Sequence, residues 1–268
     1  MDDLRLLLAM VEEKARLCQE AFMITNSVFL DLAQRSAVVS ALRRPEMKGF
    51  RGLFYGGYAD CERAVCIFLP EYIEAETDAE LNQYFLDNPE DNPLSLVRLS
   101  VQGRKPAGQK SLGHRDYLGA LMGLGLKRER IGDILVREDG ADILILKEME
   151  TFLLNYFGKA GNRYLNGESL PMRELLVPER RTEQLRDTVA SLRLDNVIAS
   201  AFRISRTKAR EAISSGLIFL NDVQVVKGDK PVGEGDKLVW RGKGKAYLRE
   251  IGPLTRKDRI NVTMERFL

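Results

Sequence analysis

Basic side chains gather just after Ser205, and phosphate binding is the chemistry that they could perform. Ser205 is a good N-cap for a helix, and Arg206, Lys208 and Arg210 follow it closely. Lysine and arginine make strong charge-assisted hydrogen bonds to phosphate, and the free N–H groups at a helix N-terminus add to the attraction. The stretch therefore predicts a phosphate-binding surface.

Two short helices and two strands must hold this surface in place. Apolar residues recur at helical spacing in Leu194, Val197, Ile198 and Ala201, and again in Ala209, Ala212 and Ile213. Gly216 is placed to end the second helix in a left-handed conformation, and the Asn221-Asp222 turn separates two short strands. Arg206 and Arg210 lie four residues apart, so they share an outward face where reversing both charges is expected to spare the fold.

The order of these features from residue 193 to 245 resembles the S4 domain, a small RNA-binding module. The matching residues are Arg193-Leu194-Asp195, Ser205-Arg206 with Ala209, Gly216, Gly235-Asp236 and the basic turn 241–245. One pair departs from the pattern, since Leu220-Asn221 stands where the family has Val-Asn. The resemblance implies a C-terminal S4-like domain that binds RNA.

The residues expected to contact RNA are basic or polar and lie on the predicted surface or in nearby turns. They are Arg193, Ser205, Arg206, Thr207, Lys208, Arg210, Lys227, Arg241, Lys243, Lys245, Arg256 and Lys257. Few aromatic residues are interleaved with these charges, so structured RNA is favoured over single strands. Asp195 is expected to hold the loop or to pair with a basic neighbour rather than to touch phosphate.

His114 is the only histidine, and with Arg115 and Asp116 it is the one candidate for acid–base catalysis. Adjacent helical residues point about 100° apart, so His114 and Asp116 do not share a face. No nucleophile motif accompanies them. We predict no catalytic residue and a possible secondary RNA contact at the two ends of one helix, made by His114, Arg115, Lys127, Arg128 and Arg130.

Gly119, Gly123 and Gly125 do not form a nucleotide-binding loop, because they lie late in or after a predicted helix. They are interpreted as small residues that let this helix pack closely on a sheet. We predict no cofactor. Cys61 and Cys66 have the wrong spacing for a zinc site, so no metal is predicted either.

Charge and composition agree with an RNA partner. Residues 182–268 hold 17 Lys and Arg against 11 Asp and Glu, a net charge of +6, while the other 181 residues carry −4. No apolar run is long enough to span a membrane, the N-terminus lacks a signal peptide, and three scattered cysteines suit a reducing compartment. A cytoplasmic protein without a membrane partner is expected, and its oligomeric state is not predicted.

The periodicity predicts an α+β protein in three parts. Residues 1–50 form a helical region in which Thr25 or Asn26 caps the second helix. Residues 51–180 form a mixed α/β domain, for which a ferredoxin-like sandwich is the candidate topology, and its last strand lies within 169–177. Residues 178–181 form a linker, and 182–268 form the S4-like domain with a C-terminal β extension.

A wider resemblance covers nearly the whole chain. Phe54-Tyr55-Gly56-Gly57-Tyr58, the stretch 113–136 and the C-terminal S4-like domain together resemble the YlmH family. The resemblance implies binding to rRNA on the ribosome, with tRNA as a further candidate partner. Family members are linked to bacterial ribosome-associated quality control on large subunits that carry a stalled peptidyl-tRNA, and to the cell-division gene neighbourhood.

Two other functions stay open. One is an RNA-modifying enzyme similar to the pseudouridine synthases that contain an S4 domain. In those enzymes the catalytic aspartate lies in a G-R-L-D motif and the S4 domain is N-terminal. Here Arg193-Leu194-Asp195 already belongs to the S4-like domain, which is C-terminal. The other alternative is a protein-interaction adaptor with a vestigial S4-like domain.

Overall fold

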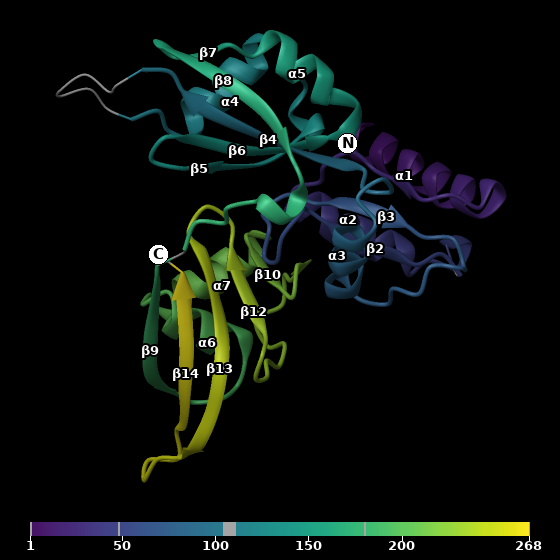
Figure 1. The fold of residues 1–268 in the computed structure, drawn as a ribbon. Helices are drawn as coiled ribbons and strands as arrows, with labels where there is room; N and C mark the ends of the chain where they lie inside the picture. Colours follow the sequence, from purple (N-terminus) through teal and green to yellow (C-terminus); the bar gives the residue numbers. More distant parts are fainter. Residues whose placement is uncertain (1, 48, 104–110, 180, 268) are drawn as a thin grey trace. The chain divides into compact units, whose positions relative to one another are not determined.

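A computed structural model describes residues 2–47, 49–103, 111–179 and 181–267 of the chain. The chain divides into two compact units, Met1–Pro178 and Glu179–Leu268 (Figure 1). The boundary falls in the predicted linker, whose residue 180 lies outside the described residues.

The first unit begins with two helices and a small sheet. These elements are α1 (Asp2–Ala21), β1 (Thr25–Asn26), α2 (Leu32–Leu42), β2 (Gly52–Tyr55) and β3 (Val65–Phe68). The strand order β1-β3-β2 joins the mostly helical first 50 residues to the strands that follow. The three-part division of the chain stays a prediction.

The expected cap of the second helix is wrong. Thr25 and Asn26 pair with β3 instead, and the Thr25 hydroxyl donates to the Lys14 carbonyl at 2.6 Å. Asp31 caps α2 by accepting a hydrogen bond from the Gln34 backbone N–H at 2.9 Å, while the Gln34 side chain accepts from the Asp31 backbone N–H at 2.8 Å. This reciprocal pair satisfies two helix-end donors and fixes the start of the helix.

A ferredoxin-like sandwich follows, and it occupies residues 94–170 of the range 51–180 in which it was expected. Its elements are β4 (Leu94–Val101), α4 (His114–Gly123), β5 (Ile131–Val136), β6 (Gly140–Leu146), α5 (Glu150–Tyr156) and β8 (Arg163–Leu170), with the short edge strand β7 (Lys159–Ala160). The antiparallel order β5-β6-β4-β8-β7 places β6 between β4 and β5, the split βαβ arrangement.

Both faces of this sheet are buried under other elements. Alternate residues of each strand point to opposite faces and so contribute to two separate cores. Val97 and Ile143 face α4 and α5, whereas Leu96 and Leu144 pack toward β2, β3 and α3 (Asp78–Asp87). The strand expected within 169–177 was placed wrongly. β8 ends at Leu170, because Pro171 has no N–H to continue the ladder, and a 3₁₀ turn at Met172–Glu174 follows.

The glycines of α4 do not bring the helix closer to the sheet, which corrects the earlier interpretation. A Cβ atom added at Gly119 or Gly123 would meet nothing within 4 Å, and both residues are exposed. Gly125 has φ +82° just after the helix ends, a conformation that favours glycine. The close approach occurs in the sheet at Gly140, where an added Cβ would lie 1.8 Å from the Leu99 carbonyl oxygen.

The second unit is a six-stranded antiparallel sheet with two helices packed on one face. Its elements are β9 (Thr182–Val189), α6 (Leu194–Ala201), α7 (Arg206–Ser214), β10 (Ile218–Leu220), β11 (Val223–Gln224), β12 (Lys237–Trp240), β13 (Gly244–Leu254) and β14 (Ile260–Phe267). The strand order β11-β10-β12-β13-β14-β9 sets the first strand of the unit beside its last.

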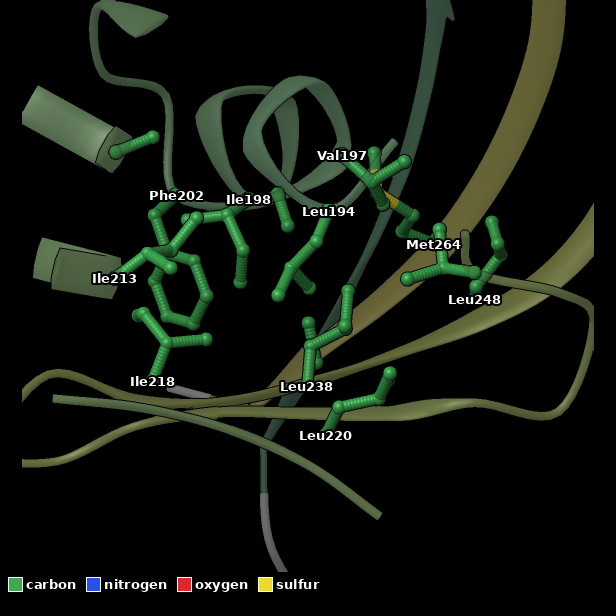
Figure 2. Close-up of a cluster of buried hydrophobic side chains, with 14 of the residues drawn as sticks. Leu194, Val197, Ile198, Phe202, Ile213, Ile218, Leu220, Leu238, Leu248 and Met264 are labelled. Carbon is green, nitrogen blue, oxygen red and sulfur yellow. The ribbon is translucent and has the colours of Figure 1, made fainter. Parts of the chain in front are cut away.

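The core of this unit comes from the apolar residues expected to form it. Leu194, Val197 and Ile198 of α6 and Ile213 of α7 pack onto the sheet (Figure 2). Gly216 has φ +68° and ends the second helix, as expected. The two helices therefore have one buried face and one face available for polar residues.

The described residues contain neither a candidate membrane span nor a candidate metal cluster. None of their helices is both long and apolar enough to cross a membrane. Within the same part of the chain, no group of three or more His, Cys, Asp and Glu side chains is arranged to hold a metal ion.

The two kinds of glycine predict opposite effects on the first unit. Gly119→Ala should raise its stability by about 0.5–1 kcal/mol, because alanine favours a helix and meets no neighbour. Gly140→Ala should lower it by about 1–3 kcal/mol, because the new Cβ forces the two strands apart. Urea unfolding followed by circular dichroism measures both. Trp240, the only tryptophan, lies in the second unit. Its fluorescence should therefore not respond to either substitution. A stabilising Gly140→Ala would contradict the observed register.

Candidate nucleic-acid interface

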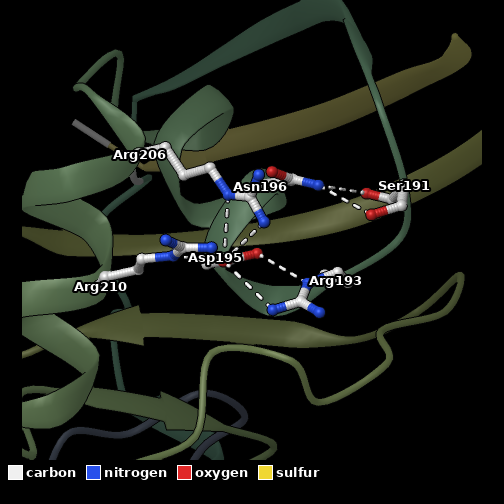
Figure 3. A network of polar contacts seen from close by, with 6 residues as sticks. All are labelled: Ser191, Arg193, Asp195, Asn196, Arg206 and Arg210. Atoms are coloured by element: carbon white, nitrogen blue, oxygen red, sulfur yellow. Dashed lines mark hydrogen bonds and ion pairs between the residues drawn. The ribbon is translucent and has the colours of Figure 1, made fainter.

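A buried carboxylate holds three arginines together at the start of the helix pair (Figure 3). Asp195, in the first turn of α6, is fully buried. Its Oδ2 accepts from Arg210 Nε at 2.9 Å and from Arg206 Nη2 at 3.0 Å. Its Oδ1 accepts from Arg193 Nε at 3.3 Å. This outcome matches the expectation that Asp195 pairs with basic neighbours.

The charge state of Asp195 follows from these contacts. Burial alone would raise the pKa of this carboxyl, but hydrogen bonds from Arg210, Arg193 and Arg206 outweigh burial and hold its pKa below the usual value. The group is therefore ionised at neutral pH. One carboxylate faces three guanidinium groups, so the cluster keeps an excess of positive charge.

Backbone contacts fix Asp195 from the other side. Its N–H donates to the Gly228 carbonyl at 3.0 Å, and the N–H of Leu194 donates to the Lys230 carbonyl at 2.9 Å. A Cβ atom at Gly228 would lie 3.1 Å from Asp195 Cβ, so glycine allows this close approach. Carbonyl groups of the loop at 228–230 thus accept hydrogen bonds from the free N–H groups at the start of α6.

Arg206 and Arg210 share one face of α7, as their spacing predicts, but that face is not simply turned to solvent. Both guanidinium groups reach Asp195, and their side chains remain 45% and 57% exposed. A double reversal to glutamate would set two carboxylates beside a buried third one. We therefore expect it to destabilise the domain, contrary to the view from sequence.

The start of α7 carries three of the predicted contacts that are exposed. The Ser205 hydroxyl caps the helix by accepting from the Lys208 backbone N–H at 3.3 Å. The side chains of Ser205, Thr207 and Lys208 are all exposed. Lys208 thus extends the positive surface of the arginine cluster.

The remaining predicted residues of this domain lie in loops and turns. Lys227 directly precedes the loop that holds Asp195, and it is exposed. Arg241 and Lys243 are exposed in the turn before β13, and Arg256 and Lys257 are exposed in the turn after it. An 11-residue strand spans roughly 35 Å, so these two basic turns lie at opposite ends of the sheet.

Lys245 lies on the sheet rather than in a turn. Its side chain is half-buried, and its Nζ lies 4.6 Å from the centroid of the Phe267 ring. Arg249, which the sequence did not single out, lies 4.4 Å from the centroid of the Tyr247 ring. Cation–π contacts therefore hold both cations against the outer face of this sheet.

In the first unit the predicted secondary contacts divide into two groups. His114, Arg115 and Lys127 are exposed at the two ends of α4. Arg128 instead donates to the carbonyls of Ile131 and Gly132 at 2.6 and 3.0 Å. Burial, reinforced by the nearby Arg63, lowers the pKa of Arg128 to about 10, so it stays charged at neutral pH.

Two further residues of this region have partners within the first unit. Arg130 forms an ion pair with Glu148. The Asp116 carboxylate accepts from the Gly113 backbone N–H at 2.7 Å and so caps the helix. Asp116 therefore works at the helix end and not as a partner that orients His114.

Sequence analysis missed two buried carboxylates of this unit. Asp142 is fully buried and accepts two hydrogen bonds from Arg98, each 2.8 Å long. Asp133 accepts from the Tyr58 hydroxyl at 2.6 Å and from the Arg63 backbone N–H at 3.0 Å. The sequence did carry a signal for both, since each aspartate interrupts an otherwise apolar strand. A charged group buried in such a strand must be paired.

The lowered pKa of Asp195 predicts a specific acid response. A carboxyl with a depressed folded-state pKa stabilises the fold above its unfolded pKa of about 3.9, and this stability is lost as the pH falls through the folded value. Asp195→Asn should cost about 2 kcal/mol at pH 7, less than for a fully buried pair because the arginines are half-exposed. Its stability should also decline less than that of the wild type below about pH 4.

Trp240 fluorescence in urea, measured from neutral to acid pH, reports this unit alone. The control is Asp229→Asn, which changes an exposed carboxylate in the adjacent loop and should match the wild type. Parallel stability curves for wild type and Asp195→Asn would show that Asp195 does not have the assigned role.

Comparison with known proteins places both units in one family. Residues 90–174 match the model described as a putative RNA-binding domain in YlmH, and residues 192–238 match the S4 domain. The chain is 34% identical over 254 residues to the Bacillus subtilis (strain 168) protein named ribosome-associated protein quality control protein P2, covering 95% of this chain and 91% of that protein.

A solved structure, titled cell division protein ylmH from Streptococcus pneumoniae, matches with 18% identity and a TM-score of 0.47 over 64% of this chain and 93% of that one. The family assignment rests on the longer and closer similarity to the Bacillus protein, together with the two matched domains. This chain belongs to the YlmH family of RNA-binding proteins with an S4 domain.

Proposed function

We propose that this protein binds structured rRNA on the large ribosomal subunit, together with the tRNA of a stalled complex, and acts there in ribosome-associated quality control. The Bacillus relative carries this process in its name. Ribosomes work in the cytoplasm, so we expect the protein there. The three-part organisation predicted from the sequence remains part of this proposal.

The observation that carries the proposal is the arginine cluster at Asp195. Ion pairs with the buried Asp195 hold the half-exposed Arg206 and Arg210 in fixed directions, which reduces the entropy lost when RNA binds. The excess positive charge beside the start of α7 attracts phosphate, and exposed Lys208 and Thr207 supply direct contacts. A rigid positive surface of this kind recognises the shape of a folded RNA backbone.

The first unit supplies a second contact in this proposal. Its residues 90–174 match a domain that is described as an RNA-binding domain in the family. The exposed groups at the two ends of α4, His114, Arg115 and Lys127, are the residues placed to meet phosphates. Arg128 and Arg130 are instead engaged within the unit, by the carbonyls of Ile131 and Gly132 and by Glu148.

We propose no catalytic step. A pseudouridine synthase-like activity would require an aspartate that reaches a base, whereas Asp195 is buried among arginines. Mass spectrometry of rRNA and tRNA nucleosides would reveal an enzyme, since a modification would be absent from a deletion strain. A protein-interaction adaptor would be revealed by purified protein that fails to bind RNA.

Two substitutions on α7 separate RNA contact from folding. Lys208→Gln should weaken binding to purified large subunits about 3- to 10-fold and lower the salt slope by about 0.7–0.9 for the lost phosphate contact, with stability unchanged. Arg210→Gln should weaken binding similarly and also lower the stability of the second unit, because Asp195 loses a partner. Sedimentation of each protein with large subunits over a range of salt gives affinity and slope.

Arg16→Gln on α1 is the matched control, since Arg16 is a 60% exposed arginine outside the S4 domain. It should retain both the affinity and the slope of the wild type. Equal binding of wild type and both α7 variants, or a binding constant that does not vary with salt, would reject the proposed surface.

A further inference from the structure

A cavity of about 450 Å³ opens beside the arginine cluster, within the second unit. It lies between the end of β9, the outer side of α6 and the turn that joins α6 to α7. Its volume falls within the range of pockets that bind small organic groups. Neither the S4 pattern nor the predicted contacts singled it out.

Three arginines from separate segments line this cavity. Arg206 belongs to the Asp195 cluster (Figure 3), Arg203 comes from the turn between the helices, and Arg259 directly precedes β14. Arg259 Nε donates to the Thr188 hydroxyl at 2.9 Å. A neutral acceptor orients the guanidinium group without cancelling its charge.

Arg203 has an unusual backbone for its residue type. Its φ is +52°, a region where residues other than glycine are uncommon and pay a cost in strain. Its side chain is 63% exposed and pairs with Glu183 at 2.6 Å. The turn thus holds a long cationic side chain at the edge of the cavity, at a position where glycine would be less strained.

The interior of the cavity is partly apolar. Ala199 and Ile204 line it and pack against the hydrophobic core of the domain. Polar groups lie along one side, where the Ser200 hydroxyl donates to Asp187 Oδ2 at 2.5 Å. The Asp187 carboxylate is also an acceptor for the amino groups that cytosine presents at its edge.

We propose that this cavity receives one unstacked nucleotide of the bound RNA, with the base against Ala199 and Ile204 and the flanking phosphates against Arg203, Arg206 and Arg259. A paired helix presents only sugars and phosphates to such a site. A bulged nucleotide brings a flat apolar ring and two phosphates together, which is the combination that this cavity matches. The inference rests on the RNA-binding function proposed above.

The test compares two hairpin RNAs that differ by one bulged nucleotide, with all four bases tried in the bulge. Fluorescence anisotropy with the full chain should show about 10-fold tighter binding of a bulged hairpin, the gain expected from burying roughly 50 Å² of a base against apolar side chains. Ala190→Trp fills the cavity from an exposed position without changing charge, and should remove this preference while keeping the affinity for the paired hairpin. Arg203→Gln should reduce the preference as well.

Ser215→Trp, an exposed position that does not line the cavity, is the control and should bind as the wild type does. If wild type binds both hairpins equally, or if Ala190→Trp keeps the preference, the cavity is not a nucleotide site although RNA binding stands. If neither hairpin binds, the proposed function and this inference both fail. An excess of nucleoside 5′-monophosphate should compete for the cavity and weaken the preference, and an absence of competition would count against a nucleotide site.

Discussion

The S4 domain of this protein depends on the burial of one charge. Asp195 is shielded from water, and an ionised carboxylate in that position is stable only when cations and hydrogen-bond donors surround it. Arg193, Arg206 and Arg210 meet that requirement from both helices of the pair. The same residue ties α6 to the loop at 228–230. The interaction therefore fixes the angle of the helices and the position of the loop together.

This arrangement couples stability to function. An arginine that left Asp195 to bind phosphate would leave a buried charge without its partner. Arg206 and Arg210 must therefore attract RNA while they stay paired with Asp195. Their surplus charge supplies an attractive field, and exposed groups such as Lys208 make the adaptable contacts. The cavity beside them extends this logic, because Arg206 belongs to both the cluster and its lining. Substitutions in the cluster should consequently change folding and binding at once, whereas those around it should change binding alone.

Local rules were enough for much of the fold. The apolar spacing of α6, the Ser205 cap and the left-handed Gly216 depend on neighbours in sequence, and all three were predicted correctly. The ferredoxin-like order also followed from the alternation of strands and helices. The errors arose where distant residues decide. Asn26 lies in a strand because it pairs with Ile67 of β3, which is distant in sequence. The exposure of Gly119 depends on how α4 packs on the sheet. The cavity has no sequence signal, since Arg203 and Arg259 come together only in the folded domain.

The central claim is that the surface around Asp195 contacts RNA on the ribosome. Ultraviolet crosslinking in cells, followed by purification of ribosomal particles and mass spectrometry of RNA-linked peptides, tests it most directly. We predict crosslinked peptides that contain residues 203–210 and 255–259 on large subunits. Crosslinks confined to residues 1–178, with none from 191–259, would contradict the account.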